Sequence, residues 1–251
     1  MKKILAVALL IVMIFSFIAC NSEQNNEHIT GNAEDTESTS TNSITNSPET
    51  EKTPQTPTEI LTPEPTPDDY FVFGKYEQDG DLNNGAEPIE WIILKDEKSK
   101  LLLVSRYILD YQDFNDTTLA KATSWGNSTL RKWLNNEFYN SAFSSAEQNK
   151  IITTKIQDYK ADNALGDVTS DKVFILNKEQ AFSYFASDYD RATTSTDYAR
   201  TRKSYVTDAY WLINSYSSDL YKHLINSKGR NENNPRVNES QGIRPVVWIN
   251  K

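Results

Sequence analysis

The distribution of aromatic residues divides this chain into a part that can fold around a core and a part that cannot. Residues 21–69 contain no Phe, Trp or Tyr, whereas all five Trp and all 13 Tyr lie from Tyr70 onward. The same segment holds six of the nine prolines, sixteen Ser or Thr, and eleven acidic residues against one Lys. Such a composition buries too little apolar surface to offset the loss of chain entropy on folding. We therefore expect a disordered Ser/Thr/Pro-rich acidic spacer at 20–69 and one globular domain at 70–251.

The first nineteen residues have the parts of a bacterial secretion signal. Two lysines precede a sixteen-residue run at 4–19 that is apolar apart from one Ser, and a small residue ends it. The run is shorter than the roughly 20 residues that a membrane-spanning helix needs. Its end, Phe17-Ile18-Ala19-Cys20, resembles the lipobox of bacterial lipoproteins, with Phe in place of the usual Leu. The resemblance implies removal of residues 1–19 and attachment of a lipid such as palmitate to Cys20, with an uncleaved anchor or ordinary secretion as alternatives.

Cysteine content and charge exclude several classes of function. Cys20 is the only cysteine, so the domain has no intramolecular disulfide, cysteine metal site or cysteine nucleophile. From Tyr70 onward the chain carries 23 basic and 24 acidic residues, and the net charge of −9 therefore comes from the spacer. A nearly neutral domain without a basic stripe is not expected to bind nucleic acid.

The pattern of apolar residues predicts an α+β domain. Apolar and β-branched runs predict strands at 70–76, 88–94, 100–106, 172–176, 210–213 and 243–249. Helical spacing or capping residues predict helices at 128–139, at 144–152 and after Asn177. Polar stretches are expected to be loops at 110–124, 153–171, 186–208 and 227–241. We expect a single domain with a mixed sheet, short helices and long loops that carry the function.

Four spaced motifs in the domain resemble a bacterial family. They are Phe73-Gly74-x-Tyr76, Pro88-Ile89-Glu90-Trp91, the series Trp125, Ser128, Leu130-Arg131, Trp133-Leu134-Asn135 and Phe138, and Gly242-Ile243-Arg244-Pro245. Together they resemble the domain-of-unknown-function family 6273 of surface and secreted proteins, which implies export but no agreed activity. The last motif is also similar to the terminal strand of C-type-lectin-like and sulfatase-modifying-factor domains, which implies a C-type-lectin-like fold. Sulfatase-modifying factors act through cysteines, and this domain has none.

Five residues are candidates for ligand binding. Trp125 and Trp211 border polar loops, where an indole ring can stack on a sugar while its N–H finds a partner. Arg131 and Asn135 share a helix face with Ser128, and Arg244 stands in the terminal motif. The alternative is structural: the tryptophans belong to the core, and the polar residues satisfy buried partners, with a carboxylate expected beside Arg244.

The segment after the first strand contains a partial calcium-binding pattern. Asp79, Asp81, Asn83 and Glu90 fall at positions 1, 3, 5 and 12 of an EF-hand count. Position 6 is Asn84 instead of Gly, and strands flank the segment where helices should stand. An ordinary turn is therefore the favoured interpretation, and no cofactor is expected.

The absence of catalytic motifs favours a binding protein. His223 is the only histidine of the domain, and the sequence contains no nucleophile elbow, phosphate loop or zinc-protease motif. We expect a non-enzymatic module on the extracytoplasmic face of the cell membrane, attached through the lipid on Cys20, that binds a cell-wall glycan or an extracellular protein. The alternatives are a structural or assembly lipoprotein with a protein partner, and an envelope hydrolase that uses loop carboxylates such as Glu90, Asp110, Asp113 and Asp116.

Overall fold

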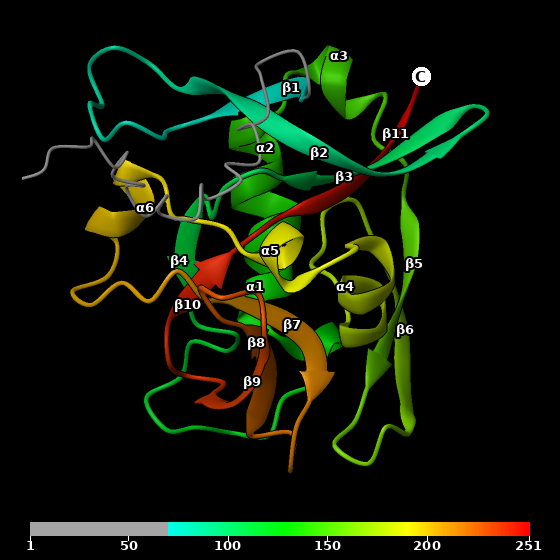
Figure 1. The fold of residues 1–251 in the computed structure, drawn as a ribbon, viewed down its shortest axis with the longest axis vertical. Helices are drawn as coiled ribbons and strands as arrows, with labels where there is room; N and C mark the ends of the chain where they lie inside the picture. Colours follow the sequence, from blue (N-terminus) through cyan, green and yellow to red (C-terminus); the bar gives the residue numbers. More distant parts are fainter. Residues whose placement is uncertain (1–69) are drawn as a thin grey trace, which may run out of the picture. The chain divides into compact units, whose positions relative to one another are not determined.

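An antiparallel sheet of four strands forms one side of the domain in the computed structural model, which describes residues 70–251 apart from the side chains at 233 and 234 (Figure 1). The predictions for residues 1–69, Cys20 included, lie outside the described residues. The strand order is β1-β2-β3-β11, with the strands at β1 (Phe71–Tyr76), β2 (Glu87–Glu97), β3 (Lys100–Ser105) and β11 (Val246–Asn250). The predicted hairpin of β2 and β3 is confirmed. All of β3 after its first residue is buried, as expected for a strand covered on both faces.

A second sheet has the strand order β4-β10-β7-β8-β9. Its strands are β4 (Asp110–Gln112), β10 (Gln241–Ile243), β7 (Tyr210–Ser215), β8 (Tyr221–Ile225) and β9 (Asn231–Arg236). Only β10 and β7 pair in parallel among these neighbours. The predicted single strand at 243–249 is wrong, because β10 and β11 belong to different sheets. Arg244 and Pro245 separate them, and Pro245 has no N–H to continue a ladder.

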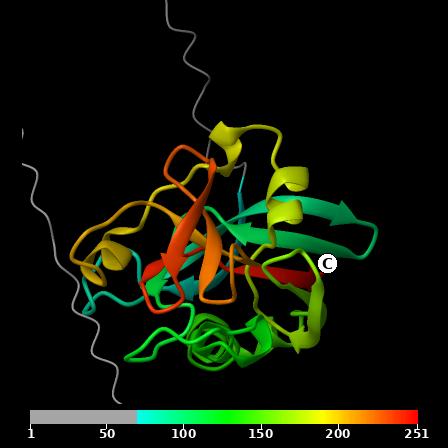
Figure 2. The same cartoon turned by 90° about the horizontal axis from the view of Figure 1, so that it is seen from below.

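One interrupted helical run packs against the strands. It consists of α1 (Thr129–Trp133), the π-helical turn η3 (Leu134–Phe138) and α2 (Tyr139–Ala142), and it extends the helix predicted at 128–139. Ser128 caps its start by accepting a hydrogen bond from the Arg131 backbone N–H. Leu130, Leu134 and Phe138 form its buried face, as their spacing predicts. The run is seen nearly end-on in Figure 2, below the strands.

The short helices begin at the capping residues that the sequence contains. A capping box of Ser144 and Glu147 starts α3 (Ser145–Gln148), and one of Asn177 and Gln180 starts α4 (Lys178–Tyr184). The remaining short helical elements are the 3-10 turn η2 (Trp125–Asn127), α5 (Asp188–Arg191) and α6 (Asp197–Thr201). In Figure 2, α4 and α5 lie on the opposite side of the strands from the helical run.

Several polar stretches contain regular structure instead of loop. The stretch 153–171 forms a separate hairpin of β5 (Thr154–Tyr159) and β6 (Leu165–Asp171). The stretch 186–208 contains α5 and α6, and 227–241 contains β9. Apolar alternation misses these elements because they are short or largely solvent-exposed.

The strand predicted at 172–176 is also wrong. The segment is buried from Val173 to Leu176, but its ladder is limited to one bridge between Phe174 and Val246. Burial, and not strand pairing, therefore explains its apolar sequence.

The two sheets and the helical run share one hydrophobic core, as expected for a single α+β domain. Within residues 70–251, no helix has both the length and the apolar character needed to cross a membrane.

Candidate ligand-binding site

A surface pocket of about 660 Å³ lies where β2 and β3 meet α4, α5 and the segments that follow them. This volume falls in the range of small-molecule sites. We call it the aromatic pocket. It is lined by Tyr70, Ile92–Leu94, Arg106, Tyr107, Tyr184–Ala186, Tyr189, Asp190, Ala192–Thr194, Ser227 and Arg244.

A cation held between two rings forms one wall of the aromatic pocket. The guanidinium carbon of Arg106 lies 4.1 Å from the ring centroid of Tyr70 and 4.8 Å from that of Tyr107. Its Nη1 donates to Glu90 Oε2 at 2.7 Å. These contacts fix the plane of the guanidinium and neutralise part of its charge. The wall is therefore pre-organised before any ligand arrives.

Tyr189 lies at the rim of the aromatic pocket. It belongs to the short helix α5, and 75% of its surface is exposed. A large ring that is this exposed loses apolar hydration when a ligand covers it, so it is suited to stacking. Asp190, its neighbour, accepts a hydrogen bond from the Ser187 hydroxyl at 2.8 Å as part of the helix cap.

Arg244, a predicted site residue, lies in the floor of the aromatic pocket and is buried. Its Nε donates to the Ser105 carbonyl at 2.8 Å, its Nη1 to the Arg191 carbonyl at 3.1 Å, and its Nη2 to the Arg106 carbonyl at 3.4 Å. The expected carboxylate partner is wrong, since these hydrogen bonds go to backbone carbonyls. Arg244 thus joins the end of β3 to the end of α5 and positions both walls of the pocket.

Trp125 and Trp211 are placed away from the aromatic pocket and are buried. The indole N–H of Trp125 donates to Asp171 Oδ2 at 2.9 Å, and that of Trp211 donates to the Gln112 carbonyl at 2.8 Å. Both rings pack on Phe114. The expectation of exposed stacking rings is wrong for both residues, because the polar loops beside them fold over the core.

Arg131 and Asn135 have structural contacts. Arg131 Nε donates to Asp171 Oδ1 at 2.6 Å. Asn135 accepts from the backbone N–H of Lys172 and donates to the carbonyl of Val173, at 2.8 Å in both cases. Together they attach the buried segment after β6 to the helical run, which matches the structural alternative.

The partial calcium pattern forms a self-contained turn. The backbone N–H of Asp81 donates to Asp79 Oδ1 at 2.8 Å, and that of Asn83 donates to Asp81 Oδ1 at 3.1 Å. The pKa of Asp79 is lowered by the hydrogen bond from the Asp81 backbone, the largest cause, and then by one from the Asn84 side chain. Glu90, the expected position-12 ligand, pairs instead with Arg106.

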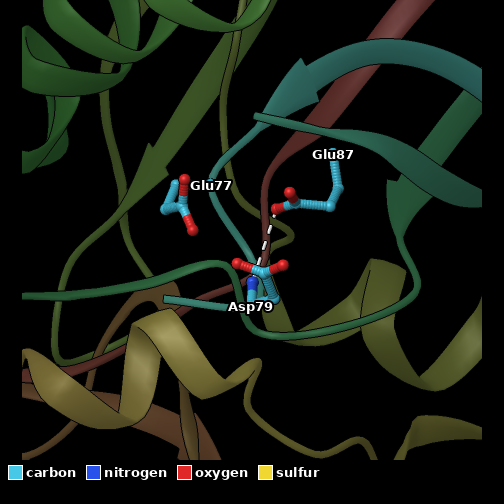
Figure 3. Close-up of side chains that lie close together, drawn as sticks. All are labelled: Glu77, Asp79 and Glu87. Carbon is cyan, nitrogen blue, oxygen red and sulfur yellow. Dashed lines mark hydrogen bonds between the residues drawn. The ribbon is translucent and has the colours of Figure 1, made fainter. Parts of the chain in front are cut away.

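A different set of carboxylates gathers at the same turn. Glu77, Asp79 and Glu87 place oxygen atoms within 4.8 Å of one another (Figure 3). The pKa of Glu77 is raised, first by lost hydration and then by the nearby acids. Glu87 Oε2 already accepts from the backbone N–H of Gln78 at 2.7 Å. Hard oxygen ligands of this kind suit calcium, but every contact here also serves the turn itself.

Two of the four loop carboxylates of the hydrolase alternative, Glu90 and Asp110, have separate partners. Asp110 is buried, accepts from the Tyr76 hydroxyl at 2.6 Å and lies 3.5 Å from Arg202 Nε. Burial raises the pKa of Asp110 and also that of Asp113. Glu90 is bound to Arg106, so neither Glu90 nor Asp110 is placed as the free partner of another acid.

Sequence reasoning missed most of the aromatic pocket. Its lining comes from segments that are separated by up to 174 positions, from Tyr70 to Arg244, and of the predicted residues only Arg244 belongs to it. Tyr189 and Arg106 occur in stretches without any motif. Tyr189 is identified only by its exposure, and Arg106 only by its contacts with Tyr70 and Tyr107.

Comparison with known proteins supports the family assignment. The model of the domain-of-unknown-function family DUF6273 matches residues 98–251, which is more than half of the chain. No curated protein and no solved structure matches the chain significantly. The match begins at the turn between β2 and β3 and includes two of the four motifs, the series from Trp125 to Phe138 and Gly242-Ile243-Arg244-Pro245. The chain therefore belongs to the DUF6273 family.

Proposed function

We propose that the domain is a non-enzymatic module that binds carbohydrate in the aromatic pocket and is displayed on the outer side of a bacterial membrane through a lipid on Cys20. The observation that carries the proposal is the wall of Arg106 between Tyr70 and Tyr107, with Tyr189 exposed at the rim. Aromatic rings pack on the apolar face of a sugar, and a fixed guanidinium donates to its hydroxyls.

The chemistry of the pocket favours binding over catalysis. Its acid, Asp190, serves in the cap of α5, and its buried cation, Arg244, donates to three backbone carbonyls. Arg106 is held by Glu90, so it is suited to donating hydrogen bonds and not to proton transfer. Apolar and aromatic side chains supply most of the other lining, as in small-molecule binding sites.

The proposal predicts that a single exposed ring controls affinity. A glycan array with the wild-type protein identifies the bound sugar, and calorimetry then measures its affinity. Tyr189→Ala is expected to weaken binding roughly tenfold, about 1.4 kcal/mol, because the stacking surface is lost. The exposed ring contributes little to folding, so the unfolding temperature of the variant should match that of wild type.

Leu119→Ala is the matched control, because Leu119 is 74% exposed and does not line the aromatic pocket. It should bind like wild type. The proposal fails if the wild-type protein binds no glycan, or if Tyr189→Ala and Leu119→Ala bind equally well.

A further inference from the structure

A second pocket, of about 930 Å³, borders the aromatic pocket. We call it the polar pocket, and its characteristic residues are Asp208, Asn226, Lys228, Arg230, Glu232 and Gln241. Tyr205 lies in its wall with 76% of its surface exposed. Each pocket therefore combines an exposed tyrosine with hydrogen-bonding groups.

The two pockets meet at the turn between β8 and β9, since Ser227 lines both. This turn is rigid. Asn226 Oδ1 accepts from the backbone N–H groups of Lys228 at 2.9 Å and Arg230 at 3.0 Å. The carbonyl of Gly229 accepts from Arg191 Nε at 3.0 Å, which fastens the turn to α5.

The charges around the two pockets balance. The cations are Arg106, Arg244, Lys228 and Arg230, and the acids are Asp190, Asp208, Glu232 and Glu239. Several of them are also paired within the protein: Glu232 accepts from the Asn226 amide at 2.7 Å, and Asp208 accepts from the Ser195 hydroxyl at 2.6 Å. A strongly charged ligand would meet as many like charges as opposite ones. An uncharged, hydroxyl-rich ligand fits this lining better.

The edge of the second sheet is poorly suited to an extended peptide. β9 is the edge strand, and its residues Asn231, Glu232 and Pro235 line the polar pocket. A peptide that added to this edge would need a row of backbone donors, and Pro235 has none. This edge of the polar pocket therefore favours a ligand that is recognised by side chains, such as a sugar chain.

Resting on the proposed function, we infer that the aromatic and polar pockets are two subsites for one uncharged oligosaccharide that crosses the turn at Ser227. A disaccharide occupies the aromatic pocket alone. A longer chain reaches the polar pocket and gains the contact with Tyr205, and the rigid turn limits the entropy lost when both subsites fill.

Calorimetry on the full chain tests the inference with three pairs of uncharged sugars: the disaccharide and hexasaccharide of N-acetylglucosamine, of glucose and of mannose. For at least one sugar, the hexasaccharide should bind wild type at least tenfold more tightly than the disaccharide. Tyr205→Ala should remove this advantage, so that both lengths bind equally. Tyr189→Ala should weaken both lengths, and Leu119→Ala should retain the advantage.

The outcomes separate the two proposals. If wild type binds both lengths equally, or if Tyr205→Ala keeps the length advantage, the two-subsite inference is overturned while the aromatic pocket stands. If the cationic hexasaccharide of glucosamine binds more tightly than its N-acetylated form, the uncharged ligand class is overturned. If none of the three sugars binds, the two-subsite inference is overturned, and the glycan array still decides the proposed function. If Tyr189→Ala has no effect, the proposed function fails and the inference fails with it.

Discussion

Lys222 is a buried cation on the β7–β8 hairpin, where it is the cross-strand partner of Ser215. Its Nζ donates to the Ser215 hydroxyl at 2.7 Å and lies 4.5 Å from the ring centroid of Phe114. Burial lowers the pKa of Lys222 to about 8, although Asp158 and Asp219 oppose the change. The folded state therefore releases a proton from Lys222 at a lower pH than the unfolded chain does.

This pKa predicts stability that rises with pH. Between pH 8 and the ordinary lysine value of 10.5, the unfolded chain binds more protons than the folded one, so the free energy of unfolding increases with pH. From pH 7 to pH 9 the gain from Lys222 should be about 1 kcal/mol. Urea unfolding at both pH values, monitored by tryptophan fluorescence, measures this gain in the free energy of unfolding. Lys222→Met should abolish the gain.

Lys98→Met is the control for this prediction, because Lys98 is exposed in the β2–β3 turn. It should keep the pH dependence of wild type. Equal slopes for wild type and Lys222→Met would show that Lys222 does not carry the effect.

At the scale of elements, the turn between β8 and β9 depends on a glycine. Gly229 has φ of 73°, and a Cβ at this position would lie 1.6 Å from the Asp188 carbonyl oxygen. Another residue would therefore bear both a left-handed backbone and a clash with the start of α5. The turn and α5 can pack this closely only because position 229 has no side chain.

Gly229→Ala should lower the free energy of unfolding by about 3 kcal/mol, because the clash is with backbone and cannot relax by a rotamer change. Gly85→Ala separates this clash from the backbone cost alone: Gly85 has φ of 90° and nothing within 4 Å of its Cβ position. The free energy of unfolding of Gly85→Ala should fall by only about 1 kcal/mol. Chemical denaturation of both variants measures the difference, and equal losses would contradict the packing argument.

Local sequence signals predicted some elements correctly and others wrongly. The capping boxes at Ser144 and Asn177 act over four residues, and both occur where the sequence predicts them. The hairpin of β5 and β6 lacks a clear apolar alternation, so its pairing could not be predicted. Val173–Leu176 shows the opposite error: an apolar run is buried by its surroundings without joining a sheet.

At the scale of the whole molecule, a nearly neutral DUF6273 domain follows an N-terminal region of different composition. The proposed membrane attachment depends on one residue, since Cys20 is the only cysteine of the chain. Among the residues that the structure describes, those that line the aromatic pocket all belong to the domain. Attachment and ligand binding should therefore be separable.

Cys20→Ser should abolish metabolic labelling with palmitate and move the protein from the membrane fraction, because the thiol that forms the thioether is gone. Its affinity for sugar should equal that of wild type. Ser22→Ala, a nearby change that keeps the thiol, should remain in the membrane fraction. A Cys20→Ser protein that stays labelled and membrane-bound would refute lipid attachment at this residue.

The sequence by itself determined the features whose signals are local: the β2–β3 hairpin, the helix with Leu130, Leu134 and Phe138 on one face, and the two family motifs that lie within residues 98–251. Only the tertiary structure decided the site. Arg244 donates a hydrogen bond to the carbonyl of Ser105, which is 139 positions away in the sequence. Both tryptophans that border polar loops lie in the core, whereas Tyr189 is exposed at the rim of the aromatic pocket. Periodicity and capping act within a few residues, whereas burial and pocket formation depend on which distant segments pack together.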